Sequence, residues 1–432
     1  MTTKVVVIGG GWAGCGAAVA AAKAGAEVTL LERTDDLLGT GISGGYMNNN
    51  GRFTAAEEAK ALGGGDLFEM SDSVTMHTDV EIPGHKHGTM YSAIEIVPKA
   101  REVVEAAGVD VAFETRISKV EKVEDESEGT RILSVSTKEG ETFTGDVFVD
   151  CTGSSGGMPN CIKYGHGCCM CILRCPTFGG RVSPAVEAGA KRLLRSRPGG
   201  FGTFSGAIEV HKDSISPAIR QELEKKGSVV IPLPKKFVDE TKLYIKSCVQ
   251  YSLKEFAENI VLIHNGFAKV VAPFFPIHRL RQVKGFEEAR IEEPLAGGRG
   301  NSVRYISMVH RDNTMQVKGF ANLFCGGETG GPIIGHTEAC VTGVLAGHNA
   351  VRYGLSKELI ELPRSLAIGD FVAHVREQMQ TEEGLSRGYT FAGSTYFYDQ
   401  MKPLGLYTTD KAAIRKRVEE LGFSGIFSQS LV

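Results

Sequence analysis

The chain has 432 residues, of which 42% are apolar and 23% are charged, and its formal net charge is -3. This composition is typical of a globular protein with more than one domain, and the small net charge excludes a global attraction to nucleic acid or to an anionic membrane. The sequence shows neither the features of a signal peptide nor an apolar run long enough to cross a bilayer. We therefore expect a cytoplasmic protein, in which ten cysteines indicate metal, cluster or catalytic chemistry rather than structural disulfides.

The best-organised stretch lies at the start, "KVVVIGGGWAGCGAAVAAAKAGAEVTLLE". Its β-branched run over 4–8 predicts a buried parallel strand, an alanine-rich helix follows, and a second strand over 27–31 ends at Glu32. The turn between strand and helix has the pattern G-x-G-x-x-G, which binds a pyrophosphate at the helix N-terminus, and the acid accepts hydrogen bonds from a ribose. We predict a dinucleotide site, with FAD or NAD favoured over NADP. The glycines of the pattern are Gly9, Gly11 and Gly14.

Two polar, glycine-bearing loops follow, "GGYMNNNGRF" (44–53) and "HKHGTMY" (85–91). Loops of this kind are expected near the reactive ring of a bound flavin, where polar side chains contact flavin or substrate. An ordinary loop is the alternative interpretation for each residue. His87 is the candidate catalytic residue of this region. Further candidates for contact are Asn48, Asn49 and Arg52.

The stretch 100–150 alternates apolar and polar residues and predicts a strand followed by an antiparallel meander. Its end, "GDVFVDCTGSSG" (145–156), is an apolar strand that stops at Thr152 and Gly153. This strand and turn resemble the segment with which flavoproteins that have two dinucleotide-binding domains approach the cofactor a second time.

Half of the cysteines lie in one segment, "CIKYGHGCCMCILRC" (161–175). The run Cys168-x-x-Cys171-x-x-x-Cys175-Pro reproduces a bacterial ferredoxin spacing, and Cys161 supplies a fourth thiolate, so we predict a [4Fe–4S] cluster on these four residues. A zinc site and a set of redox-active or nucleophilic thiols are the alternatives. Cys169 is either a replacement ligand or a free reactive thiol, and is the second candidate catalytic residue.

The segment "SPAVEAGAKRLLRSR" (183–197) predicts a helix with a basic face. That face is either simply solvated or docks an acidic electron-transfer partner or RNA. The basic residues are Lys191, Arg192, Arg195 and Arg197.

A third cofactor element lies at 319–352, "GFANLFCGGETGGPIIGHTEACVTGVLAGHNAVR". A strand runs into Cys325, a glycine turn follows, and a helix begins at about His336. The segment resembles the part of flavoproteins whose acid and following helix contact the pyrophosphate and ribityl chain, which favours FAD over NAD. With the residues above, the predicted cofactor contacts are Arg33, Gly39, Gly327, Glu328, Gly335 and Thr337.

The first and third elements, "GGGWAGCGAAVAAAKAGAEVTLLE" and "GHTEACVTGVLAGHNAVR", are similar to segments of two families of tRNA-modifying flavoproteins. One is the folate- and FAD-dependent tRNA uracil methyltransferase family (TrmFO), and the other is the MnmG (GidA) carboxymethylaminomethyl-uridine family. The resemblance implies their fold and FAD. The dense cysteine segment departs from both families, and the long helical tail with which MnmG proteins contact tRNA has no counterpart, so their substrate is not carried over.

We therefore expect an α/β fold: a Rossmann-like FAD-binding domain with a glutathione-reductase-type parallel sheet and a β-meander (1–160 and 316–360), an inserted α+β substrate domain (161–315), and a helical cap (361–432). The predicted function is a FAD-dependent oxidoreductase whose [4Fe–4S] cluster relays electrons to or from the flavin. The alternative is a TrmFO-like uracil methyltransferase of tRNA or rRNA with a cysteine nucleophile, and a flavin-binding carrier or regulatory protein is a third class.

The expected partners are a small-molecule substrate or a redox protein such as ferredoxin. No second G-x-G-x-x-G follows a strand, so a dedicated NAD(P)H domain is not expected, and NAD(P)H would meet the flavin directly. RNA is kept as a less favoured partner, and the C-terminal segment is a candidate dimer contact.

Overall fold

The structure is a computed structural model that describes residues 2–41, 44–125, 129–153, 178–197, 200–201, 203–204, 207–246, 249–271, 275–292, 303–304, 306–393 and 395–432. Its centre is a five-stranded sheet in which every strand pair is parallel. In spatial order the strands are β21 (Leu323–Cys325), β10 (Val147–Asp150), β1 (Lys4–Ile8), β2 (Glu27–Leu31) and β6 (Asp110–Ala112). The central strands β1 and β10 contain continuous, buried apolar runs because both faces of a parallel sheet are covered.

Two helices that are far apart in the sequence pack together beside this sheet, α1 (Trp12–Lys23) and α12 (His336–Gly354). Their backbones approach closely because glycine replaces a larger residue at the contact. A Cβ built at Gly343 would lie 2.0 Å from the carbonyl oxygen of Ala13, and one at Gly347 would lie 2.0 Å from that of Ala17. No larger residue fits at either position without moving one helix away from the other.

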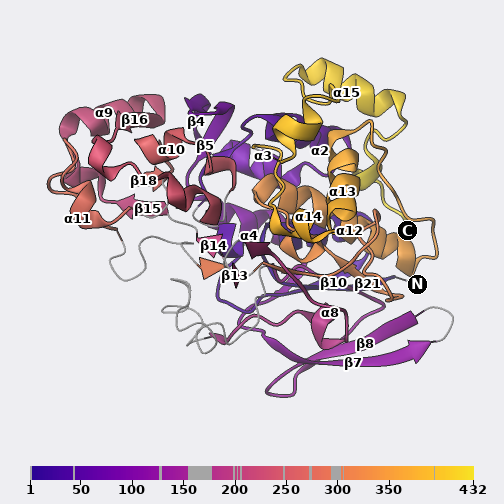
Figure 1. The fold of residues 1–432 in the computed structure, drawn as a ribbon. Helices are drawn as coiled ribbons and strands as arrows, with labels where there is room; N and C mark the ends of the chain where they lie inside the picture. The colour runs from indigo at the N-terminus through magenta and orange to yellow at the C-terminus, as the bar shows by residue number, and fades with distance from the viewer. Residues whose placement is uncertain are drawn as a thin grey trace.

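The predicted meander is present as the antiparallel sheet β7-β8-β9. Figure 1 shows β10 and β21 between α12 on one side and β7 and β8 on the other. Ile117, Ile132 and Val135 of the meander are buried and belong to the same apolar core as the parallel sheet. The strands are β7 (Ile117–Asp125), β8 (Gly129–Thr137) and β9 (Thr142–Thr144).

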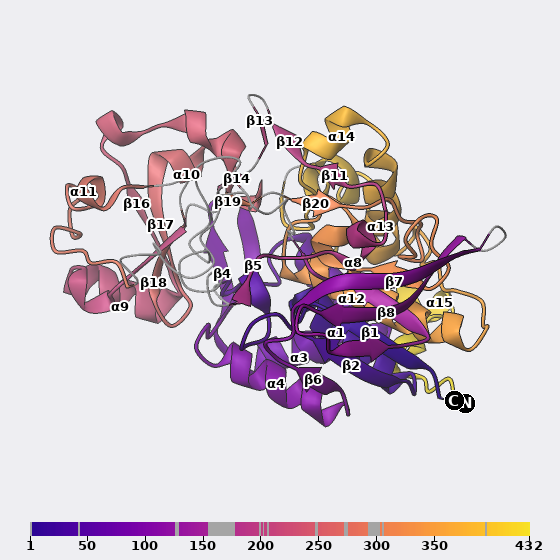
Figure 2. The same ribbon diagram turned by 90° about the horizontal axis from the view of Figure 1, so that it is seen from below.

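A second lobe has an apolar core of its own, formed on an antiparallel sheet of order β15-β18-β17-β16. Figure 2 shows this lobe beside the parallel sheet, with β4 and β5 between the two. Helix α9 packs on it and is well delimited, because Ser216 caps its start through the Ile219 N–H and Gly227 ends it. The elements are β15 (Ala207–Val210), α9 (Pro217–Lys226), β16 (Ser228–Pro232), α10 (Glu255–Glu258), β17 (Asn259–His264), β18 (Ala268–Val271) and α11 (Ile277–Leu280).

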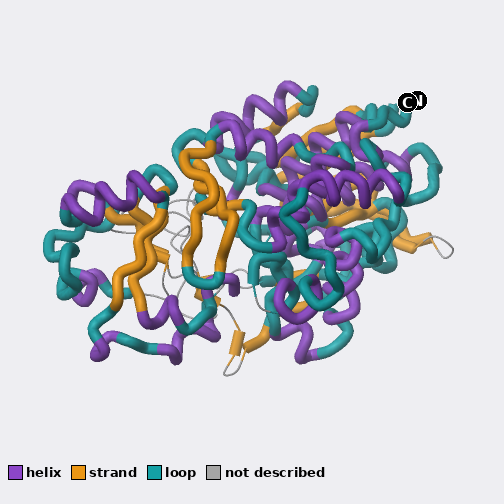
Figure 3. The backbone as a smooth tube through the Cα atoms, turned by 90° about the horizontal axis from the view of Figure 1, so that it is seen from above, coloured by secondary structure: helices purple, strands orange, loops and turns teal. Residues whose placement is uncertain are grey.

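A small sheet of order β3-β5-β4 lies against this second lobe, and β4 contacts β16. Helices from the remainder of the chain cover the parallel-sheet body, and Figure 3 shows both chain ends at one side of it. The Leu431 N–H donates to the carbonyl oxygen of Ala24 at 3.0 Å, which fastens the C-terminal residues to the end of α1. The elements are β3 (Tyr46–Met47), α2 (Gly51–Ala61), α3 (Asp66–Ser73), β4 (Thr75–Ile82), β5 (His85–Tyr91), α4 (Ile96–Ala106), α13 (Ala367–Gln378), α14 (Glu382–Ser386) and α15 (Lys411–Glu420).

The prediction of a basic helix over 183–197 is wrong. Only α8 (Pro184–Glu187) is helical, because Gly189 adopts a left-handed conformation (φ +105°) that ends it. The chain then forms β11 (Leu193–Leu194), which pairs antiparallel with β20 (Ser307–Met308). Arg195 follows β11 and is 6% exposed, so it is not part of a solvated basic face.

The predicted domain boundaries stay a prediction, although the second core falls within the predicted insertion. Within the described ranges no helix is both long and apolar enough to cross a membrane.

Candidate functional site

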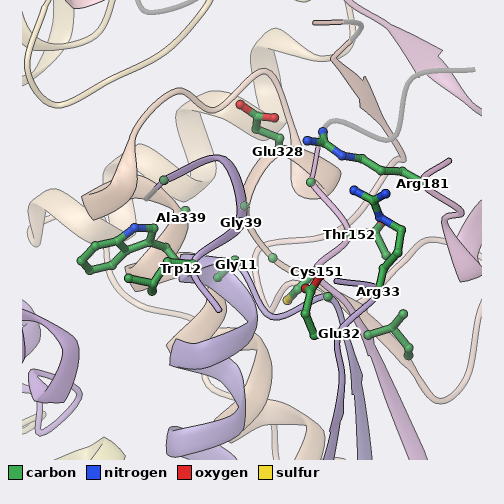
Figure 4. A pocket seen from close by; sticks show the side chains of 18 of the residues that line it. Gly11, Trp12, Glu32, Arg33, Gly39, Cys151, Thr152, Arg181, Glu328 and Ala339 are labelled. Atoms are coloured by element: carbon green, nitrogen blue, oxygen red, sulfur yellow. The ribbon is translucent and has the colours of Figure 1, made fainter. Parts of the chain in front are cut away.

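A deep groove follows the carboxyl ends of β1, β2 and β10, where parallel sheets bind their ligands. It encloses about 1310 Å³, including space open to solvent. Figure 4 shows Trp12 on one side of the groove and Arg33 and Arg181 on the other. Among the predicted cofactor contacts, the groove lining includes Gly9, Gly11, Glu32, Arg33, Gly39, Thr152, Gly153, Gly327, Glu328 and Gly335, and it omits Gly14 and Thr337.

The three glycines of the first turn have different surroundings. Gly9 has φ +101°, and a Cβ on it would lie 2.5 Å from the carbonyl oxygen of Cys151. At Gly14 a Cβ would lie 1.7 Å from the carbonyl oxygen of Gly9, so only glycine lets α1 pack against this turn. At Gly11, by contrast, no described atom beyond its chain neighbours lies within 4 Å of a built Cβ. Gly11 therefore leaves space free beside the N-terminus of α1.

Glu32 is held in one orientation at the end of β2. Its Oε2 accepts a hydrogen bond from the Gly10 N–H at 2.7 Å, and its Oε1 accepts from the N–H and hydroxyl of Thr34 at 2.8 and 2.9 Å. The residue is 7% exposed, yet it lines the groove. A carboxylate oxygen accepts more than one hydrogen bond, so Glu32 retains capacity for a ligand hydroxyl.

The end of β10 forms another wall of the groove, and Asp150 at this end is fully buried. Its carboxylate accepts hydrogen bonds from the Thr152 hydroxyl at 2.7 Å and from the Ser183 hydroxyl at 2.5 Å. Burial raises the pKa of Asp150, and these hydrogen bonds oppose that rise. Asp150 thus ties the turn at Thr152 to residue 183, on the far side of the cysteine segment.

The turn after β21 and the start of α12 form a further wall of the groove. Gly327, Glu328 and Gly335 line the groove, together with His336 and Ala339 in the first turn of the helix. A helix N-terminus carries free N–H groups and a positive dipole end that favour an anion. Two such N-termini, those of α1 and α12, therefore open on one groove.

Thr337 lies in the first turn of α12 but does not line the groove. Its hydroxyl is buried, and no described group forms a hydrogen bond with it.

Two arginines that line the groove, Arg116 and Arg181, were not predicted from the sequence as site residues. Arg33 donates to the carbonyl oxygen of Gly179, and Arg116 donates to that of Gly180 at 2.5 Å, so both hold the chain where it returns to the groove. No motif marks Arg116 or Arg181, because only the tertiary fold brings them beside Arg33.

Aromatic side chains in and beside the groove were also not predicted from the sequence: Trp12 and His336 line it. The rings of Trp12 and His336 stack with centroids 5.2 Å apart and 17° between their planes, and the Tyr91 hydroxyl lies 3.4 Å from His336 Nδ1. Trp12 is the chain's only tryptophan and stands inside the G-x-G-x-x-G pattern, which was an available signal.

His87 does not line the groove. Its side chain is 36% exposed on β5, with Nδ1 3.5 Å from Asp79 Oδ1 and its ring edge-on to Phe53. Asn48, Asn49 and Arg52 also lie outside the groove lining. The structure places Arg52 behind the start of α12, where it forms an ion pair with Glu338.

The predicted cluster ligands Cys161, Cys168, Cys171 and Cys175, and the candidate Cys169, lie outside the described residues. Of the residues that the structure does describe, none form a group of three or more histidine, cysteine or acidic side chains suited to a metal ion. The described cysteines are buried free thiols, and burial raises the pKa of each, to about 12 for Cys15. Neutral thiols of this kind are inert. They are Cys15, Cys151, Cys325 and Cys340.

These residues fit FAD. The space beside Gly11 admits a diphosphate next to the N-terminus of α1, and Glu32 can accept a hydrogen bond from a ribose hydroxyl. The N-terminus of α12 also lines the groove. The fold and site therefore define a flavoprotein of the Rossmann-like, FAD-binding class.

The comparisons with known proteins identify the family. The model of the family "Glucose inhibited division protein A" matches residues 4–273 and 253–358, and the chain belongs to this family. The structure of GidA from Aquifex aeolicus in its form II crystal superposes with a TM-score of 0.72 at 16% identity, and the match covers 99% of this chain and 74% of that one. The predicted α/β FAD-binding fold and the recognition of a MnmG/GidA-like, FAD-dependent protein are confirmed.

The curated relatives that match are tRNA uridine 5-carboxymethylaminomethyl modification enzymes MnmG. The enzyme of Chlorobaculum tepidum is 34% identical over 116 residues, which cover 26% of this chain and 18% of that protein. The enzyme of Pediococcus pentosaceus is 36% identical over 88 residues, which cover 20% of this chain and 13% of that protein. The similarity to these relatives thus extends over only a small part of their length.

Proposed function

We propose that the chain is a FAD-dependent oxidoreductase that also carries a [4Fe–4S] cluster on Cys161, Cys168, Cys171 and Cys175. Bound FAD would supply two-electron chemistry, and a cluster held by these four cysteines would supply single-electron chemistry. The observation that supports this proposal is the position of the two ends of the cysteine segment. Thr152 and Gly153 precede it and Arg181 follows it, and all three line the same groove.

Covalent geometry limits how far the cysteines can lie from that groove. Cys161 lies eight positions after Gly153 in the sequence, and Gly179 lies four positions after Cys175. An extended chain spans at most roughly 3.6 Å per residue, so Cys161 lies within about 29 Å of Gly153 and Cys175 within about 14 Å of Gly179. Arg33 and Arg116 hold the chain at 179 and 180, so the second limit applies to a fixed point on the groove wall.

The surrounding residues support the assignment of the ligands to this segment. Within the described ranges no three histidine, cysteine or acidic side chains come together as a metal site, so the ligands of a cluster would have to come from outside those ranges. Cys169 stays the candidate nucleophile, and the substrate is a small molecule or a redox protein such as ferredoxin, with NAD(P)H as an alternative electron donor.

Anaerobic purification tests the proposal. The wild-type protein should contain about four iron and four sulfide per FAD. Cys171→Ser should lose the iron and keep the FAD, whereas the matched control Cys340→Ala, which alters a buried thiol on α12, should keep both. A protein that carries a full complement of FAD but no iron would refute the cluster and leave the FAD site intact.

RNA modification is the second candidate, and family membership and the names of the curated relatives favour it. The TrmFO-like version of this function needs a reactive cysteine, for which Cys169 is the candidate. Binding of tRNA that weakens steeply with salt would support this function, because phosphate contacts release counterions. Equal, weak binding of tRNA and of an unrelated polyanion would count against it.

A further inference from the structure

A strained turn precedes α2, next to the small sheet. Asn48 and Asn50 both have positive φ values, 58° and 54°, which side chains other than glycine rarely adopt. Hydrogen bonds hold Asn50 there: among them, its Nδ2 donates to the carbonyl oxygens of Gly84 and Ala392, each at 2.9 Å, and its Oδ1 accepts from the Lys86 N–H at 3.1 Å. Strain of this kind persists only where surrounding contacts impose it, and it fixes the direction in which the next residues leave the turn.

Arg52 leaves this turn and is buried, with 1% of its surface exposed. Its Nε donates to Glu338 Oε1 at 3.1 Å, and its Nη1 donates to Gln250 Oε1 at 2.9 Å. Its Nη2 donates to the carbonyl oxygen of Ile334 at 3.3 Å and to the Thr390 hydroxyl at 3.2 Å. The guanidinium therefore joins α2, α12, the residues just before α12 and the segment at 250.

Glu338 is the third residue of α12 and is fully buried. Besides the bond from Arg52, its Oε1 accepts from the Thr390 hydroxyl at 2.6 Å and from the Phe391 N–H at 2.7 Å. The pair also presses on the helix cap, because a Cβ at Gly335 would lie 2.0 Å from Arg52 Nη2 and 2.1 Å from Glu338 Oε2. Gly335 lines the groove, so the ion pair sets where the first turn of α12 points.

A buried ion pair is a poor source of stability, because desolvation of both charges offsets their attraction. Its contribution here is geometric. We infer that Arg52 is a positioning residue, which aims the N-terminus of α12 at the cofactor groove and, through Gln250, couples that aim to the chain that leads into β17 of the second lobe. This inference rests on the proposed binding of FAD.

The measurement is the dissociation constant of FAD, determined from the release of flavin fluorescence on dilution of the purified holoprotein. Arg52→Gln should raise it on the order of tenfold, because a misdirected helix N-terminus loses its favourable interaction with the ligand. Arg52→Lys keeps the positive charge but loses the planar guanidinium with its several N–H donors, and its affinity for FAD should lie between those of Arg52→Gln and wild type. The absorbance spectrum of the bound flavin should shift in Arg52→Gln and return towards wild type in Arg52→Lys.

Glu58→Gln is the matched control. Glu58 is a fully buried carboxylate of α2 that binds the N-terminus of α13, accepting from the Ala367 and Ile368 N–H groups at 2.9 and 3.0 Å, and it is not in the groove lining. It should lower the unfolding temperature without altering the FAD affinity or spectrum. Arg52→Gln with a lower unfolding temperature but wild-type FAD affinity and spectrum would overturn the inference.

Should Arg52→Gln fail to fold, Gln250→Ala removes a neutral acceptor of the same guanidinium and should weaken FAD binding several-fold. Its effect should be less than additive with that of Arg52→Lys, since both act through one group. Additive effects, or none from Gln250→Ala, would remove the coupling to the second lobe. A wild-type protein that retains no FAD would refute the proposed function itself, and is distinguishable from all of these results.

Discussion

The two glycines Gly11 and Gly14 allow a test that separates the cofactor site from the fold. In Gly11→Ala the new methyl group enters free space, and the backbone there has φ -71°, which alanine adopts without strain. The free energy of unfolding of the flavin-free variant should therefore lie within about 1 kcal/mol of the wild-type value. The loss of a good N-cap lowers it, and the reduced entropy of the unfolded chain raises it by a similar amount.

The same methyl group occupies the space through which a diphosphate would approach the N-terminus of α1. A hydrogen bond to a charged group contributes about 1.5–3 kcal/mol, so displacement of the phosphate should weaken FAD binding on the order of a hundredfold. Gly14→Ala is different, since its Cβ would lie 1.7 Å from the Gly9 carbonyl oxygen and must push α1 away from β1. That overpacking should cost roughly 1–3 kcal/mol or more of stability.

The assay compares urea unfolding of the flavin-free proteins with FAD titrations followed by flavin fluorescence. We expect Gly11→Ala to lose affinity at nearly constant stability, and Gly14→Ala to lose both. Wild-type FAD affinity in Gly11→Ala would refute the assignment of the pyrophosphate to this turn.

Three further predictions concern buried groups. Glu32→Gln should weaken FAD binding and cost about 1–3 kcal/mol of stability, because an amide cannot accept the bonds from both Gly10 and Thr34, as calorimetry and FAD titration would show. Burial raises the pKa of Glu58 to about 7 from 4.5, so the folded protein binds more protons than the unfolded chain between these pH values. The free energy of unfolding should therefore fall as pH rises through this range, by up to about 1.36 kcal/mol per pH unit. Glu58→Gln should abolish this pH dependence, and an unchanged dependence would show that Glu58 is not its source. Burial lowers the pKa of His264, whose Nδ1 lies 2.8 Å from His77 Nε2, to about 4 from 6.5. The contribution of the neutral His264 to stability is therefore full above pH 6.5 and is lost as pH falls towards 4. In His264→Gln the urea concentration at the midpoint of unfolding should fall less steeply over this acidic range than in wild type.

The local parts of the cofactor site were predictable from sequence, because each depends on neighbouring residues. The strand, glycine turn, helix and second strand of residues 4–32 form as predicted, since β-branched runs and glycines determine them within a few positions. The meander and the helix at His336 follow from equally local patterns.

What failed depended on distant contacts. The basic run at 183–197 has good helix formers, but Gly189 ends the helix and pairing with β20 draws Leu193 and Leu194 into a strand. Arg116 joins the groove only through the fold. Arg52 looked like a flavin contact because its loop is polar, and only the structure shows that its partner, Glu338, lies 286 residues away in the chain.

The close packing of α1 against α12 has a consequence for biosynthesis. The two helices are translated far apart in time, because more than three hundred codons separate the end of α1 from the start of α12. A nascent chain therefore exposes α1 and its glycine turn without their partner until α12 has been made, so the complete groove for the flavin forms only after that glycine-faced helix has emerged.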